Sequence, residues 1–154
     1  MYIDNGKILI NNLNTGQILS GLDIGDKTIG IAISDHNLII ASPLKTIERK
    51  GGLKDLELLR NIFEQFNIGA VIIGFPLSLD GNENNRTKKT KEFAKKLTNF
   101  LSLNIFLQDE RFSTDVVVRE MKERNYSNKK VKKYVNDAAA AYILQGFIDK
   151  YCVK

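Results

Sequence analysis

The sequence predicts an α/β protein with a mixed β-sheet flanked by helices. Three strand-like segments follow one another over residues 18–24, 29–34 and 38–41, which favours an antiparallel start to the sheet. Helix-like and strand-like segments then alternate, giving the order βββαβαβαα. Such alternation favours parallel pairing of the later strands.

The first strands are preceded by a polar segment and interrupted by a polar turn. Residues 18–24 and 29–34 contain β-branched residues in partial alternation, and Asp35, His36 and Asn37 are typical of a turn. Residues 1–17 are rich in asparagine, and we expect a flexible N-terminal arm there, with at most a short strand over 7–10. Residues 18–154 would form the single domain.

The later elements follow from apolar periodicity. Over residues 53–66 apolar side chains recur at intervals of three and four, which predicts a helix whose acids, Asp55 among them, face solvent. The continuous apolar run over 70–75 is typical of a buried parallel strand. Further patterns predict helices over 86–101, 114–124 and 135–151 and a strand over 104–108.

Composition excludes several classes of protein. The apolar runs are too short to span a bilayer, and the first twenty residues lack a signal-peptide layout, so we expect no membrane partner. The single cysteine, Cys152, cannot form an internal disulfide, which suits a cytoplasmic location. The sequence has no Cys/His cluster of the kind that binds structural zinc.

The net charge of +5 is unevenly distributed. Two segments carry most of the basic residues: Arg86, Lys88, Lys89, Lys91, Lys95 and Lys96 in the first, and Arg119, Lys122, Arg124, Lys129, Lys130, Lys132 and Lys133 in the second. Such segments attract nucleic acids by releasing condensed counterions, although two solvated helix faces would look the same. No aromatic platform for stacking single-stranded bases is evident.

Three acidic positions stand among apolar or small neighbours. Asp23 lies in the first strand, Asp109 and Glu110 follow the strand that ends near residue 108, and Asp137 begins an alanine-rich run of the last helix. The carboxyl ends of neighbouring parallel strands meet at one edge of a sheet, and a helix of small residues packs closely on it. We therefore expect these acids to converge.

Converging carboxylates repel one another unless a cation neutralises them. Carboxylate oxygens are the ligands that Mg²⁺ and Mn²⁺ prefer, and a pair of such ions can activate water against a phosphodiester. Each acid also has a structural alternative: Asp23 as a turn cap, Asp137 as a helix N-terminal residue, and Asp109, Glu110 and Arg111 as a local ion-pair turn.

The loop that follows the buried strand is a candidate for substrate contact. It runs from Gly74 through Pro76 and Asp80 to Gly81, at the strand edge where α/β proteins bind ligands, with Arg86 shortly after it. A plain connecting loop is the alternative. Ser113 and Thr114 are expected to cap the next helix, the lone His36 is interpreted as a turn residue, and Cys152 as inert.

Four stretches together resemble the YqgF family, also called the RuvX family of Holliday-junction resolvases. They are GLDIGDKTIGIAISD, IIGFPLSLDGNENNR, DERFST and DAAAAYILQ, in the family's order. The resemblance implies an RNase H-like fold with a five-stranded mixed sheet, and a cytoplasmic nuclease that uses Mg²⁺ or Mn²⁺ in 5′-end maturation of pre-16S ribosomal RNA.

The resemblance also implies roles for particular residues. Asp23, Glu110 and Asp137 match the catalytic and metal-binding acids, Arg111 would lie near the scissile phosphate, and residues 74–81 would form the substrate loop. The family often has a basic residue where Thr28 stands, so Lys27 would have to contact the substrate instead.

The leading hypothesis is therefore a metal-dependent endonuclease acting on pre-16S rRNA, with a pre-ribosomal particle as a possible partner. The alternatives are a resolvase of four-way DNA junctions, which would have to be a dimer, and a non-catalytic nucleic-acid-binding module. The sequence does not distinguish RNA from DNA as the substrate.

Overall fold

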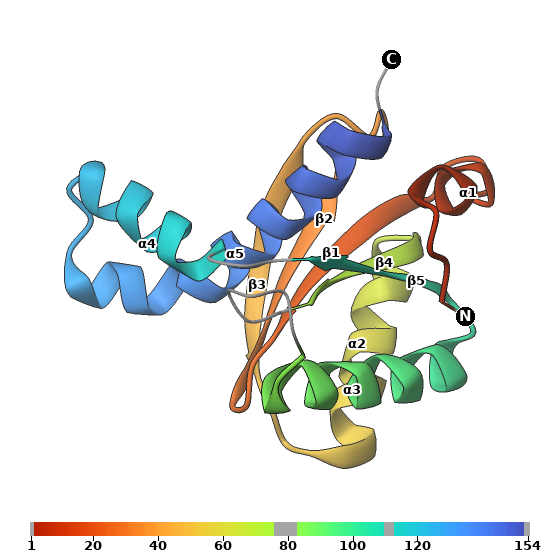
Figure 1. The fold of residues 1–154 in the computed structure, drawn as a ribbon, viewed down its shortest axis with the longest axis horizontal. Coiled ribbons are helices and arrows are strands. Elements are labelled where there is room, and N and C mark those ends of the chain that lie inside the picture. The colour runs from red at the N-terminus through yellow and green to blue at the C-terminus, as the bar shows by residue number, and fades with distance from the viewer. Residues whose placement is uncertain (1, 76–82, 110–112, 153–154) are drawn as a thin grey trace.

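The computed structural model describes residues 2–75, 83–109 and 113–152. Its five-stranded sheet has the order β3-β2-β1-β4-β5 (Figure 1). The strands are β1 (Ile18–Ile24), β2 (Thr28–Ser34), β3 (Ala41–Glu48), β4 (Ile68–Phe75) and β5 (Asn104–Asp109). The first three strands pair antiparallel, and β1, β4 and β5 pair parallel, so the predicted mixed sheet is confirmed.

Helices cover both faces of the sheet. They are α1 (Gly6–Asn11), α2 (Gly52–Gln65), α3 (Asn85–Leu101), α4 (Ser113–Glu123) and α5 (Asn128–Tyr151). One core lies between the sheet and α2 and α3, and a second lies between the sheet and α5 with α1. Because β4 is covered on both faces, its sequence is a continuous apolar run. Within the described ranges, none of the helices has both the length and the apolar character needed to cross a membrane.

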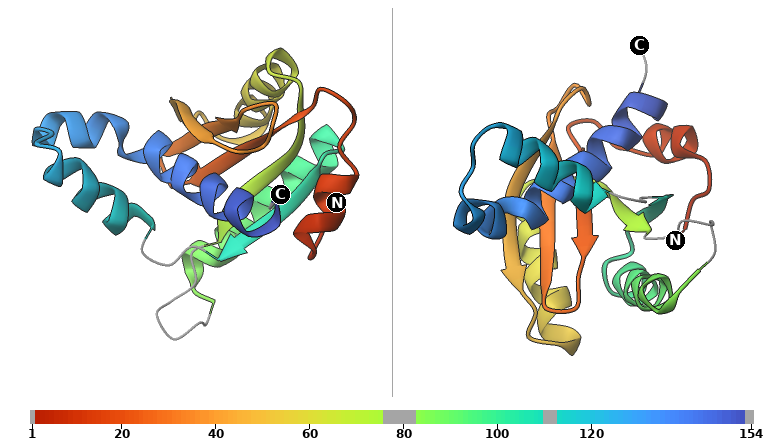
Figure 2. Two further views of the ribbon diagram at one scale, coloured as in Figure 1. Left: turned by 90° about the horizontal axis from the view of Figure 1, so that it is seen from above. Right: turned by 60° about the vertical axis from the view of Figure 1, so that its left-hand side comes forward.

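Two glycines let α5 lie directly on the sheet. A Cβ atom on Gly21 of β1 would lie 2.7 Å from the Cβ of Leu144, and one on Gly30 of β2 would overlap the carbonyl oxygen of Asn136. Figure 2 (left) shows α5 along the sheet, with α4 and the first turns of α5 projecting beyond it. The close contact requires residues without a side chain at both positions.

The third strand begins later than expected. The prediction of a strand over 38–41 is wrong, because Leu38 has a positive φ of 54° and the Asp35 carboxylate accepts hydrogen bonds from the backbone N–H groups of Ile39 and Ile40. These bonds hold a loop, so pairing with β2 starts at Ala41.

The last helix begins earlier than expected. It starts at Asn128, with the Ser127 hydroxyl accepting a hydrogen bond from the N–H of Lys130, and not at residue 135. Its first turns are rich in lysine and carry little apolar periodicity, which is why the pattern missed them. Asp137 therefore lies well inside α5, and its interpretation as a helix N-terminal residue is wrong.

Asp55 is buried, although the periodicity placed it on the solvent side of α2. Its carboxylate accepts hydrogen bonds from the N–H groups of Lys50 and Gly51 and from Nε of Arg49, at 3.2 Å or less. These donors stabilise the charge of the Asp55 carboxylate and fix the backbone just before α2.

The N-terminal segment packs on the domain and does not form the expected loose arm. Residues 6–11 are helical where a short strand was expected over 7–10, because the Asn5 side chain caps the helix by accepting from the N–H of Lys7. Leu9 is fully buried in the α5 core, and the N–H of Ile3 donates to the carbonyl of Ile105 in β5 at 3.0 Å.

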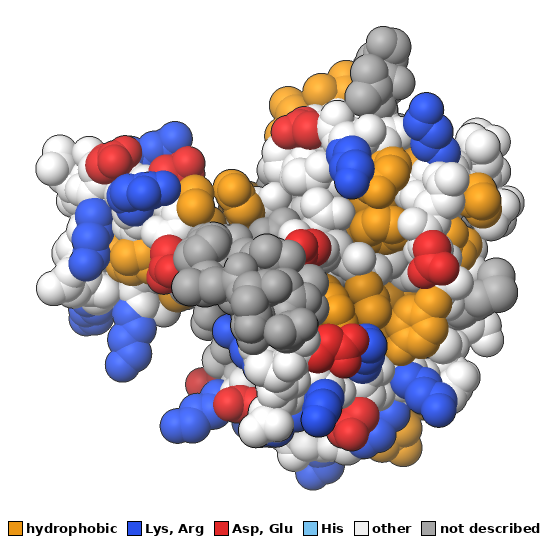
Figure 3. Space-filling view, viewed as in Figure 1, with side chains coloured by type: hydrophobic (Ala, Val, Ile, Leu, Met, Phe, Trp, Pro, Cys, Tyr) orange, Lys and Arg blue, Asp and Glu red, His pale blue; other side chains and the backbone are white. Residues whose placement is uncertain are grey.

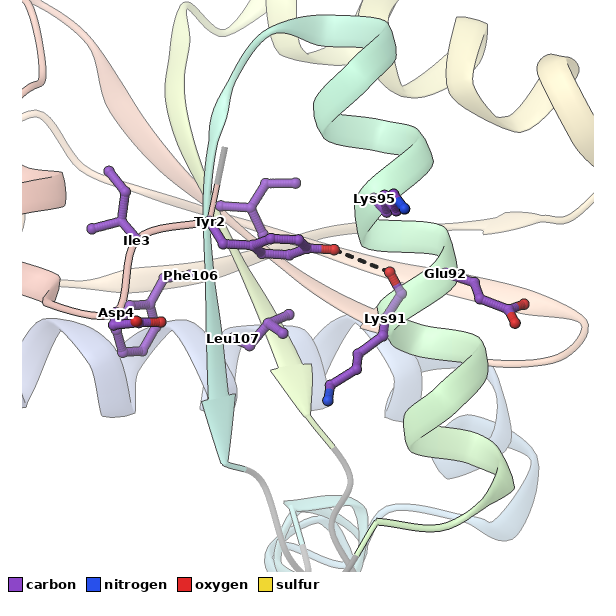
Figure 4. Close-up of a pocket in the computed structure, with 9 residues that line it drawn as sticks. Tyr2, Ile3, Asp4, Lys91, Glu92, Lys95, Phe106 and Leu107 are labelled. Atoms are coloured by element: carbon purple, nitrogen blue, oxygen red, sulfur yellow. Dashed lines mark hydrogen bonds between the residues drawn. The ribbon is translucent and has the colours of Figure 1, made fainter.

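A cavity of about 530 Å³ lies between this segment, β5 and α3 (Figure 4). The Tyr2 ring lies across it, and its hydroxyl donates to the carbonyl oxygen of Lys91 at 3.1 Å. The N-terminal segment thus connects the edge strand to α3.

The Leu9→Ala substitution tests this packing. We expect a loss of about 2–5 kcal/mol in the free energy of unfolding, because the substitution leaves a cavity in the α5 core. Ile8→Ala is the matched control, since Ile8 is 52% exposed. Urea unfolding measures both, and equal stabilities of the two variants would contradict the packing of α1.

Candidate active site

Asp23 lies at the carboxyl end of β1 and faces α5. It is paired with Gly30 across the antiparallel ladder, and Gly21, two residues before it on the same face, contacts α5. Its side chain is 14% exposed. Asp23 is thus a strand residue on a covered face, and the alternative of a turn cap is wrong.

Asp137 lies on α5 directly over Gly30, the residue that pairs with Asp23 in the β1–β2 ladder. A Cβ atom on Gly30 would lie 2.9 Å from the backbone nitrogen of Asp137, and residues opposite one another in a ladder have Cβ atoms about 4.5–5.5 Å apart. The side-chain amide of Asn136 donates to the hydroxyl of Thr28 at 3.1 Å and holds α5 at this level. The fold therefore brings Asp23 and Asp137 to one place on the sheet.

Burial raises the pKa of both carboxyl groups. For Asp23 the desolvation is opposed by Arg86, whose guanidinium lies 3.5 Å from the carboxylate. For Asp137, which is 8% exposed, the desolvation that raises the pKa is opposed by backbone N–H groups, first that of Ala138 at 3.1 Å. The two charges are therefore only partly compensated by the described protein atoms.

This donor set fits a hard divalent cation. Burial destabilises the charged forms of these two carboxylates, which lie on one face of the sheet. Mg²⁺ or Mn²⁺ bound between them would stabilise those charged forms. No three His, Cys, Asp or Glu side chains within the described ranges are grouped to hold a metal ion. The third predicted acid, Glu110, follows β5 in the chain but lies outside those ranges.

Several other predicted site residues also lie outside the described residues: Pro76, Asp80, Gly81 and Arg111. Gly74 is described, and it pairs with Gln108 near the ends of β4 and β5. Asp109, which ends β5, pairs with Phe75. Both strands thus end at the edge of the sheet where β1 carries Asp23.

The basic residues begin at this site and extend away from it. Arg86, in the first turn of α3, contacts Asp23, and the residues of its basic segment are exposed. The second segment covers the projecting α4 and the start of α5, where Figure 3 shows basic side chains. Lys27 is exposed in the β1–β2 turn, where Lys89 pairs with Asp26 at 3.5 Å. A polyanion that reached the acids would meet both basic segments.

Arg49 is a residue of the site that the sequence did not reveal. Its guanidinium donates to the carbonyl of Gly25 at 3.0 Å, and its backbone N–H donates to the carbonyl of Lys27 at 2.8 Å. Its ion pair with the buried Asp55 and its position over the Phe93 ring fix the side chain. Arg49 therefore holds the β1–β2 turn beside Asp23, and no local motif marks it.

His36 is exposed in the turn after β2, as expected. Cys152 is partly buried, and burial raises the pKa of its thiol, which disfavours the reactive thiolate.

The fold is that of known resolvases. The T. thermophilus RuvC protein, solved in complex with a Holliday junction substrate, matches with a TM-score of 0.52 at 11% identity, over 87% of this chain and 95% of that chain. The Fowlpox virus resolvase, solved with Holliday junction DNA, matches with a TM-score of 0.52 at 15% identity, over 90% of this chain and 100% of that chain. The protein thus has the RNase H-like fold that its motifs implied.

The sequence comparisons give the family. A family model described as "RuvX: Holliday junction resolvase" matches residues 17–150, and the chain belongs to this nuclease family. A relative from Zymomonas mobilis is 46% identical over 135 residues, covering 88% of this chain and 82% of the relative. One from Paramagnetospirillum magneticum is 40% identical over 141 residues, covering 92% and 91%. Both carry the name "Putative pre-16S rRNA nuclease".

Proposed function

We propose that this protein is a divalent-metal-dependent endonuclease that matures the 5′ end of pre-16S rRNA. The observation that carries the proposal is the juxtaposition of Asp23 and Asp137, two acids 114 positions apart in the printed sequence, on one covered face of the sheet. A protein that only bound a polyanion would gain nothing from buried carboxylates, because they repel phosphate.

The relatives support the choice of substrate. Those from Zymomonas mobilis and Paramagnetospirillum magneticum are named for pre-16S rRNA, and each aligns over more than four fifths of both chains. The exposed basic residues of α3 and of the α4–α5 hairpin provide the charge that binding to RNA, free or in a pre-ribosomal particle, requires.

The residues have distinct roles in this proposal. Asp23 and Asp137, together with Glu110, would hold Mg²⁺ or Mn²⁺, which when bound activates water and stabilises charge on the phosphate. Arg86 and Lys27 would bind substrate phosphates beside the acids, with Arg111 near the cleaved bond. The loop from Gly74 to Gly81, with Pro76 and Asp80, would contact the substrate.

Cleavage of a labelled pre-16S leader RNA tests the proposal. We expect products with Mn²⁺ but not with a chelator, and none from Asp23→Asn. Asp26→Asn is the matched control, because Asp26 is the neighbouring turn acid and its side chain is 79% exposed. Cleavage that survives chelation, or equal activity of both variants, would refute the proposal.

A second candidate function is resolution of four-way DNA junctions. The family description and the two solved resolvase complexes favour it. Cutting two strands of a junction requires two sites, so this activity predicts a dimer. Light scattering that gives the mass of one chain, with cleavage of RNA and not of a junction, would exclude it. Metal-independent binding without products would instead identify a binding module.

A further inference from the structure

A groove beside Asp137 contains most of the tyrosines of this protein. Its volume is about 740 Å³, and it lies between α4, α5 and the start of β3. Three of the five tyrosines in the sequence line it, namely Tyr126, Tyr134 and Tyr142. Arg124, Lys130 and Asp137 also line it. We call this cavity the tyrosine groove.

The groove follows one face of α5. Tyr134, Ala138, Tyr142 and Gln145 recur at intervals of four and three, so they line up along the helix. Tyr134 and Tyr142 are eight residues apart, or about 12 Å along the helix axis, and Asp137 lies between them. The alanines at 138 and 141 leave space between the two rings.

The two rings are available to a ligand. Tyr134 is 38% exposed and Tyr142 is 40% exposed, and the cavity that both line contains the carboxylates of Glu120 and Asp137 as well as apolar and basic residues. Lysines lie over two of the tyrosine rings: Nζ of Lys130 is 4.2 Å from the centre of the Tyr126 ring, and Nζ of Lys133 is 5.1 Å from that of Tyr134, so that Lys133 lies over one face of the Tyr134 ring. Aromatic faces beside cations are the features that bind unpaired bases and their phosphates.

We propose that the tyrosine groove binds a single-stranded segment of the nucleic-acid substrate, next to the bond that is cleaved. Bases would stack on Tyr134 and Tyr142, and Arg124 and Lys130 would neutralise the phosphates. This proposal rests on the proposed function, because it takes Asp137 as part of the active site. Paired bases present no face to a tyrosine ring, so a duplex would bind less tightly.

Binding measured in chelator tests the groove separately from cleavage. The probe is a labelled oligouridylate, compared with an RNA duplex of equal length, by fluorescence anisotropy. We expect Tyr134→Ala and Tyr142→Ala each to weaken binding of the single strand by about 5- to 150-fold. Tyr134→Phe and Tyr142→Phe keep the ring and should bind within about twofold of the wild type.

The chain offers a matched control and an independent signal. Tyr2 is 40% exposed like Tyr142, but it lies at the β5 edge, so Tyr2→Ala should not change binding. The sequence contains no tryptophan, so tyrosine emission can be followed directly and should be quenched by the oligouridylate. Asp137→Asn removes a negative charge from the groove and should tighten binding in chelator.

The outcomes separate the two proposals. Unchanged binding by both alanine variants, or tighter binding of the duplex, would overturn the groove even if the wild type cleaves RNA. Weakened binding by the alanine variants with retention in the phenylalanine variants would support it, whether or not metal-dependent products appear. Melting curves for each variant exclude a loss of folding as the cause.

Discussion

Asp137→Asn should reduce cleavage of the leader RNA by about 100-fold or more while leaving the protein folded. Loss of a residue that only supports a metal ligand typically costs about 10- to 100-fold, and Asp137 is proposed as a ligand itself. The amide has the same shape as the carboxylate and can still accept the hydrogen bond from the N–H of Ala138. Initial rates at saturating Mn²⁺ measure the effect.

The same substitution should lower activity without lowering stability. Burial raises the pKa of Asp137 above its usual 3.8, so in chelator the folded state binds a proton more tightly than the unfolded state. The contribution of Asp137 to stability is therefore largest in acid and falls as the pH rises from 3.8 through the raised pKa. The amide of the Asp137→Asn variant cannot ionise, so the free energy of unfolding of this variant should not fall in this way as the pH rises. The variant should therefore be at least as stable as the wild type at neutral pH.

Urea unfolding in chelator, from mildly acidic to neutral pH, measures this difference. Asp26→Asn is the control, because it replaces a neighbouring acid whose side chain is 79% exposed. A variant at position 137 that is clearly less stable than the wild type at neutral pH would mean that the carboxylate charge is fully compensated in the folded protein. It would also weaken the case that a cation binds there.

Gly30→Ala should disrupt both the fold and the activity. The added methyl group would overlap the carbonyl oxygen and carbon of Asn136, which are backbone atoms of α5 and cannot rotate away. Overpacking of a core costs about 1–3 kcal/mol and occasionally more, and we expect about 3 kcal/mol here. Any relaxation must lift α5 from β2, which moves Asp137 away from Asp23 and removes cleavage.

Gly25→Ala is the graded control within the same hairpin. Its added Cβ would lie 3.0 Å from the carbonyl oxygen of Thr28, a tight contact that a small shift relieves. We therefore expect a clearly smaller loss of stability in urea unfolding. If Gly30→Ala were as stable and as active as Gly25→Ala, α5 could not be packed on β2 as the structure has it.

Local patterns were enough to predict most of the fold. The apolar run of β4, the periodicity of α2 and the small residues around Asp137 each act over a few neighbouring positions, so the sequence shows them directly. The loop before β3 and the buried Asp55 were missed, since both depend on hydrogen bonds between a side chain and backbone several residues away.

The sequence by itself determined the types of residue at the candidate site, their order and the class of chemistry that they suit. An acid inside an apolar strand and an acid in an alanine-rich helix can be recognised without coordinates as candidate functional residues. The reason is that burying a charge that nothing compensates is costly in free energy. The glycines of the first two strands are also visible in the sequence, and glycine inside a strand often marks the close approach of another backbone.

Only the tertiary structure decided which residues meet. The clamp of Arg49 on the β1–β2 turn and the pairing of Arg86 with Asp23 join segments that are distant in the chain, and the groove beside Asp137 joins α5 to α4 and to β3. The tyrosines of the groove are eight residues apart or more, so no short motif contains them. They form one surface because α5 starts at Asn128 and packs on glycines of the sheet, and that contact is a property of the folded chain.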